Sequence, residues 1–365
     1  MTARRAPVEH APSQEGEFAP FRPPIWLRGG HAQTVLGRHW PGNAVPPELD
    51  PAAPGSWTTH RRIDLEDGDA LIVADTIPPG WDDASGAVLM VHGLGGDERS
   101  PYVARVATRL ARAGRRVARL NLRGAGPGFG LARKTYHAGL TEDLRAVLDA
   151  FADPQTMPDA TSSETPRPFP PARRWMVVGF SLGANLTLKL AAEAATRPIP
   201  GWVGFVAANP PLDLAACCRH LRHPFNRFYD WNFTRQLKFA VERLHQRFPD
   251  LGPTGVENVK GVFDFDEAYT APRHGFRDAE DYYARSSAGF LLDQISLPGL
   301  VIHAWDDPFI PEESQRSFRF PGSIEVVCST RGGHLGYIAD RPVEGTRRWL
   351  DARITHAVNE RFHWL

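Results

Sequence analysis

The spacing of hydrophobic residues changes character along the chain. From residue 58 to residue 76, apolar and polar side chains alternate in two short segments joined by Glu66-Asp67-Gly68-Asp69. A period of two is typical of half-buried strands, and an Asp-Gly step between two strands favours a hairpin. We therefore expect strands over 58–65 and 70–76, paired at an antiparallel edge of a sheet.

Continuous apolar runs then alternate with amphipathic segments. Runs that predict buried strands lie at 87–92, 116–124, 176–180, 204–210, 298–305 and 323–329. Segments with helical spacing lie at 101–113, 139–152, 182–195 and 342–360. Strands separated by helices are typical of a parallel sheet with helices on both faces. The predicted fold class is therefore α/β, with a mostly parallel central sheet.

The strand–helix alternation stops between residues 211 and 296. This stretch is rich in aromatic and charged residues, with helical patterning at 233–248 and 279–287. Because an insertion after the sixth strand would lie over the strand ends, we expect 211–296 to form a helical cap. The core is then predicted at 57–210 and 297–365.

Three other segments differ in composition from the predicted core. Residues 21–56 are aromatic and interrupted by Pro and Gly, which predicts an ordered N-terminal arm lying on the core. Residues 1–20 are polar and contain Pro, so we expect them to be disordered. Residues 153–173 are rich in Pro, Ser and Thr, and we expect a surface loop, since the alternation resumes directly after them.

Composition and charge narrow the class of protein. Lys plus Arg and Asp plus Glu both number 42, and this balance argues against a nucleic-acid binder. No run of 18 apolar residues and no secretory signal pattern occurs, so we expect a cytoplasmic protein without a transmembrane helix. Cys217, Cys218 and Cys328 cannot form a disulfide framework. No HExxH and no paired CxxC occurs, so neither a metal nor another cofactor is expected.

Gly179-Phe180-Ser181-Leu182-Gly183 has the form G-x-S-x-G. The short pattern alone is weak, but here a predicted strand leads into it and a predicted helix leaves it. That context is typical of a nucleophile elbow, a turn so tight that the residues two before and two after the serine must be small. The turn would put the Ser181 hydroxyl at a helix N-terminus, whose dipole favours negative charge. The alternative interpretation is an ordinary turn with a capping serine.

A serine nucleophile needs a base, and the base needs an acid to orient it. After an elbow of this kind the acid comes next in the chain and the histidine last. The strand at 298–305 is followed by two aspartates. We favour Asp307, because the D-x-x-I-P pattern puts it at the start of a turn that Pro311 closes into the next helix. Asp306 is the alternative, and the other aspartate of the pair is expected to cap a turn.

A histidine in the required order follows the last predicted strand. His334 lies in Arg331-Gly332-Gly333-His334-Leu335-Gly336, and glycines on both sides would let the backbone bend so that the imidazole reaches Ser181. We therefore predict that His334 is the base.

Two backbone N–H groups are expected to stabilise an oxyanion beside Ser181. One is that of Leu182, directly after the serine. The second is that of Leu94, in the Gly-rich segment after the 87–92 strand. We expect the His92 ring to brace this segment, without a part in the chemistry.

Several stretches together resemble the YheT-like α/β-hydrolases, relatives of the ABHD esterases and lipases. They are HGLGGDERSPY (92–102), NLRGAG (121–126), YHAGLTEDL (136–144), GFSLGAN (179–185), FDEAYTAPRHGFRDAEDYY (265–283), DDPFIP (306–311) and GGHLGY (332–337). PPIWLRGGHAQT (23–34) resembles the family's N-terminal arm, with Gly-Gly-His where the family has an Asn-Pro-His type of sequence. The resemblance spans about residues 20–345. It implies an α/β-hydrolase fold and a Ser-Asp-His hydrolase of acyl esters, with these roles on Ser181, Asp307 and His334.

Two weaker patterns concern the surface and the cap. Arg105, Arg109, Arg112 and Arg116 recur at near-helical spacing, which favours a solvated helix face with acidic partners over a contact with lipid headgroups. The aromatic residues of the cap would either line an acyl pocket or pack in the interior of the cap. They include Phe225, Phe228, Trp231 and Phe233.

The sequence thus predicts a serine hydrolase that cleaves carboxylic, lipid-like acyl esters through an acyl-enzyme intermediate. An acyltransferase or a thioesterase would use the same residues, and a binding protein on a hydrolase scaffold is a third alternative. The expected partner is a small acyl ester and not a nucleic acid, while peripheral contact with lipid is left open. The length of the acyl chain depends on the geometry of the cap.

Overall fold

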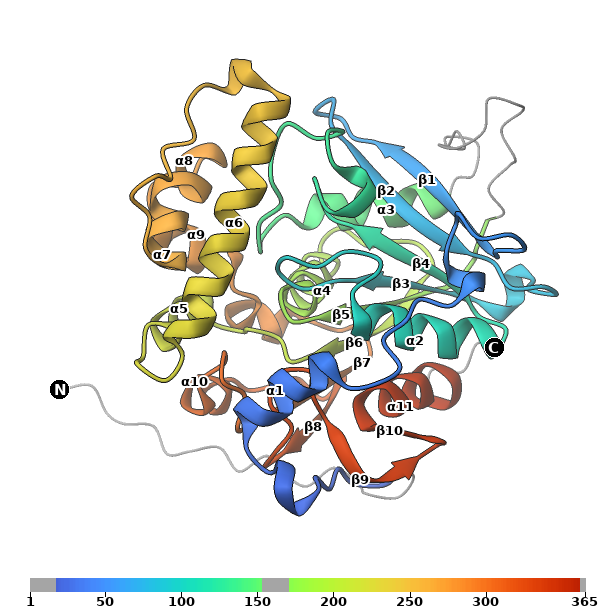
Figure 1. Cartoon of the computed structure of the whole chain (residues 1–365). Helices are drawn as coiled ribbons and strands as arrows, with labels where there is room; N and C mark the ends of the chain where they lie inside the picture. Colours follow the sequence, from blue (N-terminus) through green and yellow to red (C-terminus); the bar gives the residue numbers. More distant parts are fainter. Residues whose placement is uncertain (1–17, 153–170, 362–365) are drawn as a thin grey trace.

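A central sheet of eight strands organises the computed structural model, which describes residues 18–152 and 171–361 (Figure 1). The strand order is β1-β2-β4-β3-β5-β6-β7-β8. The pairs β1–β2 and β2–β4 are antiparallel, and the pairs from β4–β3 to β7–β8 are parallel. The predicted α/β class and the antiparallel hairpin at the sheet edge are confirmed. The disorder predicted for 1–20 and the loop predicted for 153–173 fall mainly outside the described residues.

The elements follow the predicted ranges to within a few residues in most of the chain. The strands of the sheet are β1 Thr58–Asp64, β2 Ala70–Thr76, β3 Ala87–Val91, β4 Arg116–Asn121, β5 Trp175–Phe180, β6 Trp202–Ala208, β7 Gly299–Ala304 and β8 Ile324–Ser329. The helices outside the cap are α1 Gly30–His39, α2 Pro101–Arg112, α3 Thr141–Ala152, α4 Leu182–Glu193, α10 Glu312–Ser317 and α11 Trp349–His356.

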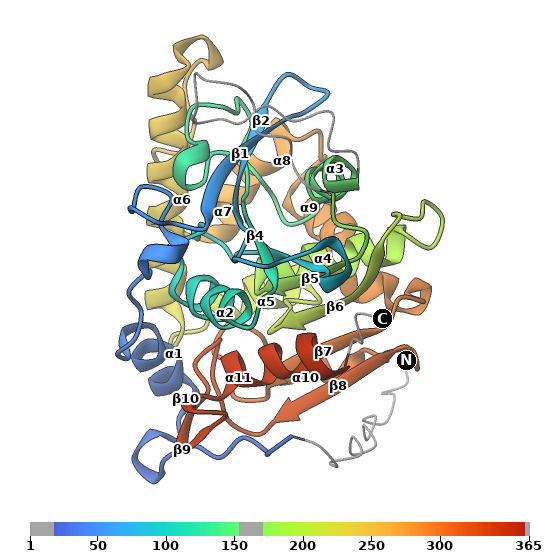
Figure 2. The same cartoon turned by 90° about the vertical axis from the view of Figure 1, so that its right-hand side faces the viewer.

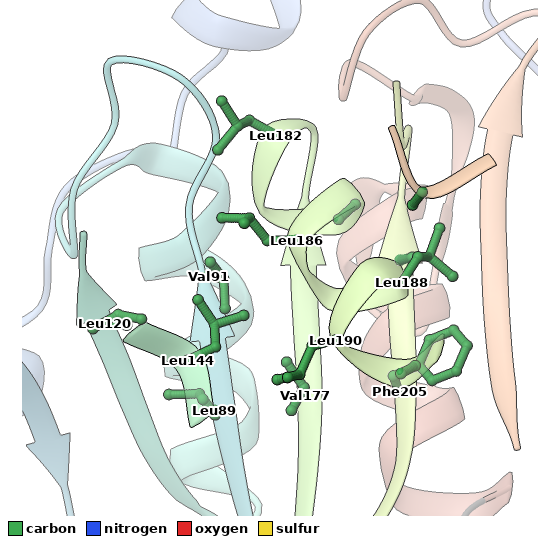
Figure 3. Close-up of a cluster of buried hydrophobic side chains, with 14 of the residues drawn as sticks. Leu89, Val91, Leu120, Leu144, Val177, Leu182, Leu186, Leu188, Leu190 and Phe205 are labelled. Atoms are coloured by element: carbon green, nitrogen blue, oxygen red, sulfur yellow. The ribbon is translucent and has the colours of Figure 1, made fainter. Parts of the chain in front are cut away.

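Strand β3 shows why the central strands lack alternation in the sequence. Successive side chains of a strand point to opposite faces, and in β3 both faces are fully covered. Leu89 and Val91 pack against α3 and α4, whereas Val88 and Met90 pack against α2 and α11. Figure 3 shows the first of these layers, in which leucines of α4 lie over the sheet. A strand buried on both faces reads as a continuous apolar run, which is the pattern that predicted it.

The C-terminal helix starts later than expected. We predicted a helix over 342–360, but a hairpin of β9 Ile338–Val343 and β10 Thr346–Arg348 occupies its first part. The turn of this hairpin is formed by Glu344 and Gly345, both with positive φ (46° and 77°). A two-residue hairpin turn of type I′ needs two such residues in succession, whereas the residues of an α-helix have negative φ. Helix α11 therefore begins only at the buried Trp349.

The arginine pattern around α2 divides between two environments. Arg105, Arg109 and Arg112 lie on α2 and form ion pairs with Asp351, Glu344 and Glu48, as expected for a helix face with acidic partners. Arg116 was wrongly included in that face. It belongs to β4, where its guanidinium lies 2.8 Å from Asp75 Oδ1 with both side chains fully buried.

The segment between β6 and β7 contains helices and no strand among its residues, all of which are described. Its helices are α5 Leu214–Leu221, α6 Arg227–Arg247, α7 Val262–Phe265, α8 Ala271–Arg273 and α9 Ala279–Ser286. They form a separate group beside the sheet, in which the long α6 runs alongside the shorter helices (Figures 1 and 2). We keep the name cap for this segment, with the proposed boundaries 211–296. No helix of residues 18–152 or 171–361 is long and apolar enough to cross a bilayer.

Two neutral histidines lie in the seam between the cap and the core. His274 of the cap accepts or donates a hydrogen bond of 3.1 Å with Thr135 Oγ1 of the core, and its ring centre lies 4.5 Å from that of His137. Burial lowers the pKa of His137 to about 2 and that of His274 to about 4. Positive charges on Arg123, Lys134, Lys189 and Arg285 lower these pKa values further.

From the two buried histidines we predict that the folded protein loses stability in mild acid. Below pH 6.5 the unfolded chain protonates both histidines while the folded protein does not, so stability is complete above that pH and falls as the pH drops. The free energy of unfolding should fall by up to about 1.4 kcal/mol per pH unit for each histidine. Urea unfolding between pH 7 and pH 5 should be less steeply pH-dependent for His274→Gln than for the wild type. The exposed His39→Gln serves as control, and equal slopes for all three proteins would contradict the prediction.

Candidate active site

The predicted site residues all follow parallel strands that are neighbours in the sheet. Leu94 comes after β3, Ser181 after β5, Asp307 after β7 and His334 after β8. Because these strands run in the same direction, their carboxyl ends meet along one edge of the sheet. The strand between β5 and β7 is β6, which is followed by Asn209. Residues separated by up to 240 positions thereby converge at one place.

Ser181 lies in a strained turn between β5 and α4. Its backbone has φ 53° and ψ −119°, which is unusual for a residue with a side chain. A Cβ on Gly183 would lie 2.4 Å from the carbonyl oxygen of Val91, and one on Gly179 would lie 2.4 Å from that of Gly183. Both distances are shorter than any real contact, so the turn accepts only glycine at these positions. The prediction that the flanking residues must be small is confirmed.

The structure brings Ser181, His334 and Asp307 into one chain of hydrogen bonds. His334 Nε2 lies 2.8 Å from Ser181 Oγ, and His334 Nδ1 lies 2.7 Å from Asp307 Oδ2. When Nδ1–H donates to the carboxylate, Nε2 is free to accept the serine proton. The Asp307 side chain is held in turn by the backbone N–H of Phe309 (2.8 Å) and the amide of Asn209 (2.8 Å).

The neighbouring Asp306 has a different contact. Its Oδ1 accepts a hydrogen bond of 2.9 Å from the backbone N–H of Gly333, and it does not reach the His334 ring. Burial raises the pKa of the Asp306 carboxyl. Of the two aspartates left open by the sequence, Asp307 is therefore the one that contacts the imidazole, while Asp306 fixes the loop that carries it.

The two predicted oxyanion donors have N–H groups without an acceptor. Leu94 and Leu182 both line the cavity in front of Ser181, and no acceptor in the described part of the chain takes either N–H. A Cβ on Gly93 would lie 3.0 Å from Ser181 Cβ, which shows how closely the segment after β3 approaches the serine. Unpaired N–H groups beside a nucleophile are available to stabilise developing negative charge.

Three side chains hold the segment after β3 in position. Tyr102 Oη accepts from the N–H of Gly93 (2.9 Å), and Tyr136 Oη accepts from that of Gly95 (2.8 Å). Burial raises the pKa of Tyr136 to about 12, so its phenol is neutral. His92 Nδ1 lies 2.7 Å from the Gly93 oxygen, and its Nε2 accepts from the N–H of Leu122 (3.1 Å). The brace predicted for His92 is confirmed, whereas the two tyrosines were missed.

The N-terminal arm supports the loop that carries His334. Thr34 Oγ1 on α1 accepts a hydrogen bond of 2.8 Å from the backbone N–H of His334. A Cβ on Gly333 would lie 2.3 Å from the oxygen of Gly30, so the arm and the loop touch backbone to backbone. Gly30 also leaves no room for a Cβ, which would lie 1.8 Å from the oxygen of Asp306. The glycines around His334 thus allow a close approach as well as a bend.

Asn209 and Thr34 were not predicted as site residues. Asn209 has φ 48° and donates from its amide to Asp307 Oδ2 and to the oxygen of Gly333 (3.2 Å). In the sequence, Asn209 is a polar residue at the end of a buried strand and is followed by two prolines, and this pattern could have indicated a site residue. Thr34 lies in the arm sequence that carried the family resemblance. Their roles depend on contacts between residues that are far apart in the chain, and such contacts cannot be predicted from sequence spacing.

A cavity of about 390 Å³ lies between Ser181 and the cap. Ser181 and His334 line one part of it together with the Phe309 ring, whose centre is 4.4 Å from that of His334. The cap contributes mainly apolar side chains to the remaining wall, among them Leu214, Leu221, Phe233, Leu237, Val241, Leu244, Val262 and Phe265. This volume and lining suit a small apolar ligand group beside the serine.

Comparison with known proteins agrees with the fold and the motifs. The profile of the alpha/beta hydrolase family matches residues 88–349. The chain is 29% identical over 352 residues to the Escherichia coli K12 protein named "Putative esterase YheT", covering 94% of this chain and 93% of that protein. It is 24% identical to the mouse protein named phospholipase ABHD3, covering 87% and 73%. It is 26% identical to the Saccharomyces cerevisiae monoacylglycerol lipase, covering 73% and 58%. The resemblance seen in the motifs is confirmed.

Solved structures with similar folds are more distant in sequence. The Pyrococcus furiosus esterase Pf2001 superposes with a TM-score of 0.51 at 16% identity, covering 84% of this chain and 92% of that chain. A 2,6-dihydroxy-pseudo-oxynicotine hydrolase superposes with a TM-score of 0.54 at 18% identity, covering 84% and 70%. At such low identity these likenesses show the fold alone.

The contact between the arm and the His334 loop predicts a measurable change in local stability. Thr34→Val removes the acceptor of the His334 N–H, and a lost hydrogen bond of this kind should speed amide exchange in residues 330–338 by about 2- to 10-fold. Thr34→Ser keeps the hydroxyl and should exchange like the wild type. Hydrogen–deuterium exchange followed by mass spectrometry makes the comparison, and equal exchange in Thr34→Val and wild type would rule out this support.

Proposed function

The chain belongs to the alpha/beta hydrolase family, and from this premise we propose that it cleaves carboxylic esters with Ser181 as nucleophile. The observation that carries the proposal is the pair of hydrogen bonds, 2.8 Å and 2.7 Å long, that joins Ser181 through His334 to Asp307. A serine hydroxyl is a weak nucleophile unless a base accepts its proton. The carboxylate keeps the base in the correct tautomer and stabilises its protonated form.

In the first half of the reaction, Ser181 Oγ attacks the carbonyl carbon of the ester while its proton passes to His334 Nε2. The negative charge that develops on the carbonyl oxygen is stabilised by the N–H groups of Leu94 and Leu182, at the positive end of α4. His334 then returns the proton to the alkoxide, the C–O bond breaks, and an alcohol leaves. The acyl group remains on Ser181 as an ester.

In the second half, water takes the place of the alcohol. His334 accepts a proton from the water as its oxygen attacks the acyl carbon, and the same two N–H groups stabilise the second oxyanion. The proton then returns to Ser181 Oγ, and a carboxylic acid is released. Each residue thus resumes its starting state.

The cavity supports a substrate with an apolar acyl group. Its cap side is lined mainly by aliphatic and aromatic side chains, which favour burial of a hydrocarbon chain by about 0.8 kcal/mol per CH₂ group. The relatives named esterase, phospholipase and monoacylglycerol lipase support an ester of this type. We therefore propose a small acyl ester as the substrate, and a series of p-nitrophenyl esters of graded chain length should give the highest kcat/KM for a chain that fills the cavity.

Removal of the nucleophile should abolish both turnover and labelling. Ser181→Ala should lower kcat for p-nitrophenyl butyrate by at least about 10³-fold and should prevent labelling by a fluorophosphonate. Ser317→Ala, at an exposed serine on α10, should behave like the wild type in both assays. Equal rates in the Ser181→Ala and wild-type proteins would end the proposal.

Added methanol separates hydrolysis from acyl transfer, because a transferase would form the methyl ester.

The two aspartates should differ in their effect on turnover. Asp307→Asn cannot hold the imidazole in the correct tautomer and should lower kcat by about 10⁴-fold. Asp306→Asn keeps an oxygen that can accept from Gly333, so its effect should stay below about tenfold, the size of one hydrogen bond. Both variants should be compared by kcat and by rate of fluorophosphonate labelling. The reverse order of effects would assign the acid to Asp306.

A further inference from the structure

An exposed strip of aromatic and basic side chains runs along the outside of the cap. It covers residues 219–235, from the end of α5 to the first part of α6, and we call it the cap ridge. Phe225, Phe228 and Trp231 expose 80%, 66% and 53% of their surface. We expected the aromatic side chains of the cap to line the pocket or to pack inside the cap. Both expectations are wrong for Phe225, Phe228 and Trp231, whereas Phe233 lines the cavity as one of them predicted. Aromatic side chains clustered in water on one short segment mark a surface for contact.

The cap ridge also carries an excess of positive charge. Within 219–235 there are four arginines (Arg219, Arg222, Arg227 and Arg235) and a single acidic residue, Asp230. The Asp230 carboxylate accepts the backbone N–H of Val262. All four arginines are exposed, and no carboxylate of residues 18–152 or 171–361 forms an ion pair with them. By contrast, the arginines of α2 are paired with acidic residues.

The ridge and the cavity wall are two faces of the same helices. Leu221, Phe233 and Leu237 line the cavity. Phe228 and Trp231 lie on the exposed side of α6, and Phe225 lies in the loop between α5 and α6. Tyr229 connects the two faces, because its ring packs edge-on against Phe309, which lies on His334. Figures 1 and 2 show the start of α6 close to α1, and Tyr229 stacks on His31 of that helix.

We propose that the cap ridge docks the protein onto the surface of an anionic phospholipid bilayer. Phe and Trp side chains insert at the boundary between headgroups and acyl chains, and arginines between them attract anionic headgroups. Docking by the ridge would bring the cavity next to the acyl esters of that bilayer. This last consequence rests on the proposed function, whereas docking itself does not involve Ser181.

An acidic protein or a second copy of this chain would be the other occupants of such a surface. The combination of exposed aromatic side chains and arginines unpaired within the described part of the chain, all on one short segment, favours a bilayer over either, since a protein interface needs a broad, closely fitting patch. Vesicle flotation tests for the bilayer, and sedimentation velocity tests for the second copy.

Flotation of the full-length protein with vesicles tests the proposal directly. We expect binding to phosphatidylcholine vesicles that contain about 30 mol% phosphatidylserine, and weaker binding to phosphatidylcholine alone or at high salt. The triple variant Phe225→Ser, Phe228→Ser, Trp231→Ser should bind the anionic vesicles at least about tenfold more weakly. The variant Arg222→Gln, Arg227→Gln, Arg235→Gln should lose the preference for phosphatidylserine. Phe290→Ser, at an equally exposed phenylalanine outside the ridge, should bind like the wild type.

Two further measurements keep failure of docking apart from failure of folding or of catalysis. The two triple variants and Phe290→Ser should keep the thermal midpoint of the wild type within a few degrees and the same turnover of the water-soluble p-nitrophenyl acetate. Ser181→Ala should bind vesicles normally. Equal vesicle binding by the wild type and both triple variants would overturn the proposal, as would no binding by the wild type. A dimer that sedimentation velocity shows to be dissociated by the aromatic variant would overturn it in favour of a second copy.

Discussion

The site depends on one close backbone contact, between the turn at Ser181 and the end of β3. Gly183 approaches the carbonyl oxygen of Val91 so closely that no side chain fits between them. This contact fixes two things at once: the strained backbone of Ser181 and the position of the Gly93–Leu94 segment beside it. Leu94 and Leu182, whose N–H groups are the proposed oxyanion donors, line the same cavity as the serine. A rigid arrangement of this kind suits the proposed role, since donors that are already in place need no reorganisation during the reaction.

Support for the histidine comes from the far end of the chain. His334 is held through its backbone by Thr34, and the next strand is held by Gln33, whose side chain bonds both the N–H and the oxygen of Ile338. The Gln33 side-chain amide thus makes the same pair of hydrogen bonds to Ile338 that the backbone of a neighbouring strand would make. The arm is thus part of the structure that positions the imidazole. Gly333 and Gly336 are the positions at which the backbone of the loop contacts α1, so a side chain would not fit there.

One face of the cap helices lines the cavity, and the opposite face is exposed to solvent. The inner side chains of the cap bury apolar surface around the cavity, which accounts for their hydrophobicity. Its outer side chains at 219–235 contribute little burial of apolar surface, because Phe225, Phe228 and Trp231 remain mostly exposed. Exposed aromatic residues lower the solubility of a protein, so a cluster of them on the ridge indicates a binding function and not a contribution to folding. The proposed bilayer contact supplies one and relates it to an apolar substrate.

Much of the protein could be predicted from local sequence. Buried strands such as β3, the hairpin of β1 and β2, and the elbow at Ser181 are encoded by nearest neighbours, because strand burial and tight turns depend on a few adjacent side chains. The order of Ser181, Asp307 and His334 followed from the chain order that accompanies an elbow of this kind, with each candidate located after a predicted strand. Local pattern failed where a residue's role depends on distant contacts. Arg116 looked like part of a helix face, but it pairs with Asp75 on a neighbouring strand. Thr34 gave no local sign of contacting His334, and the two prolines after Asn209 marked that residue without indicating its contact with Asp307. Which of Asp306 and Asp307 contacts the His334 ring was likewise decided by the packing of elements that are far apart in the chain, as was the exposure of Phe225, Phe228 and Trp231.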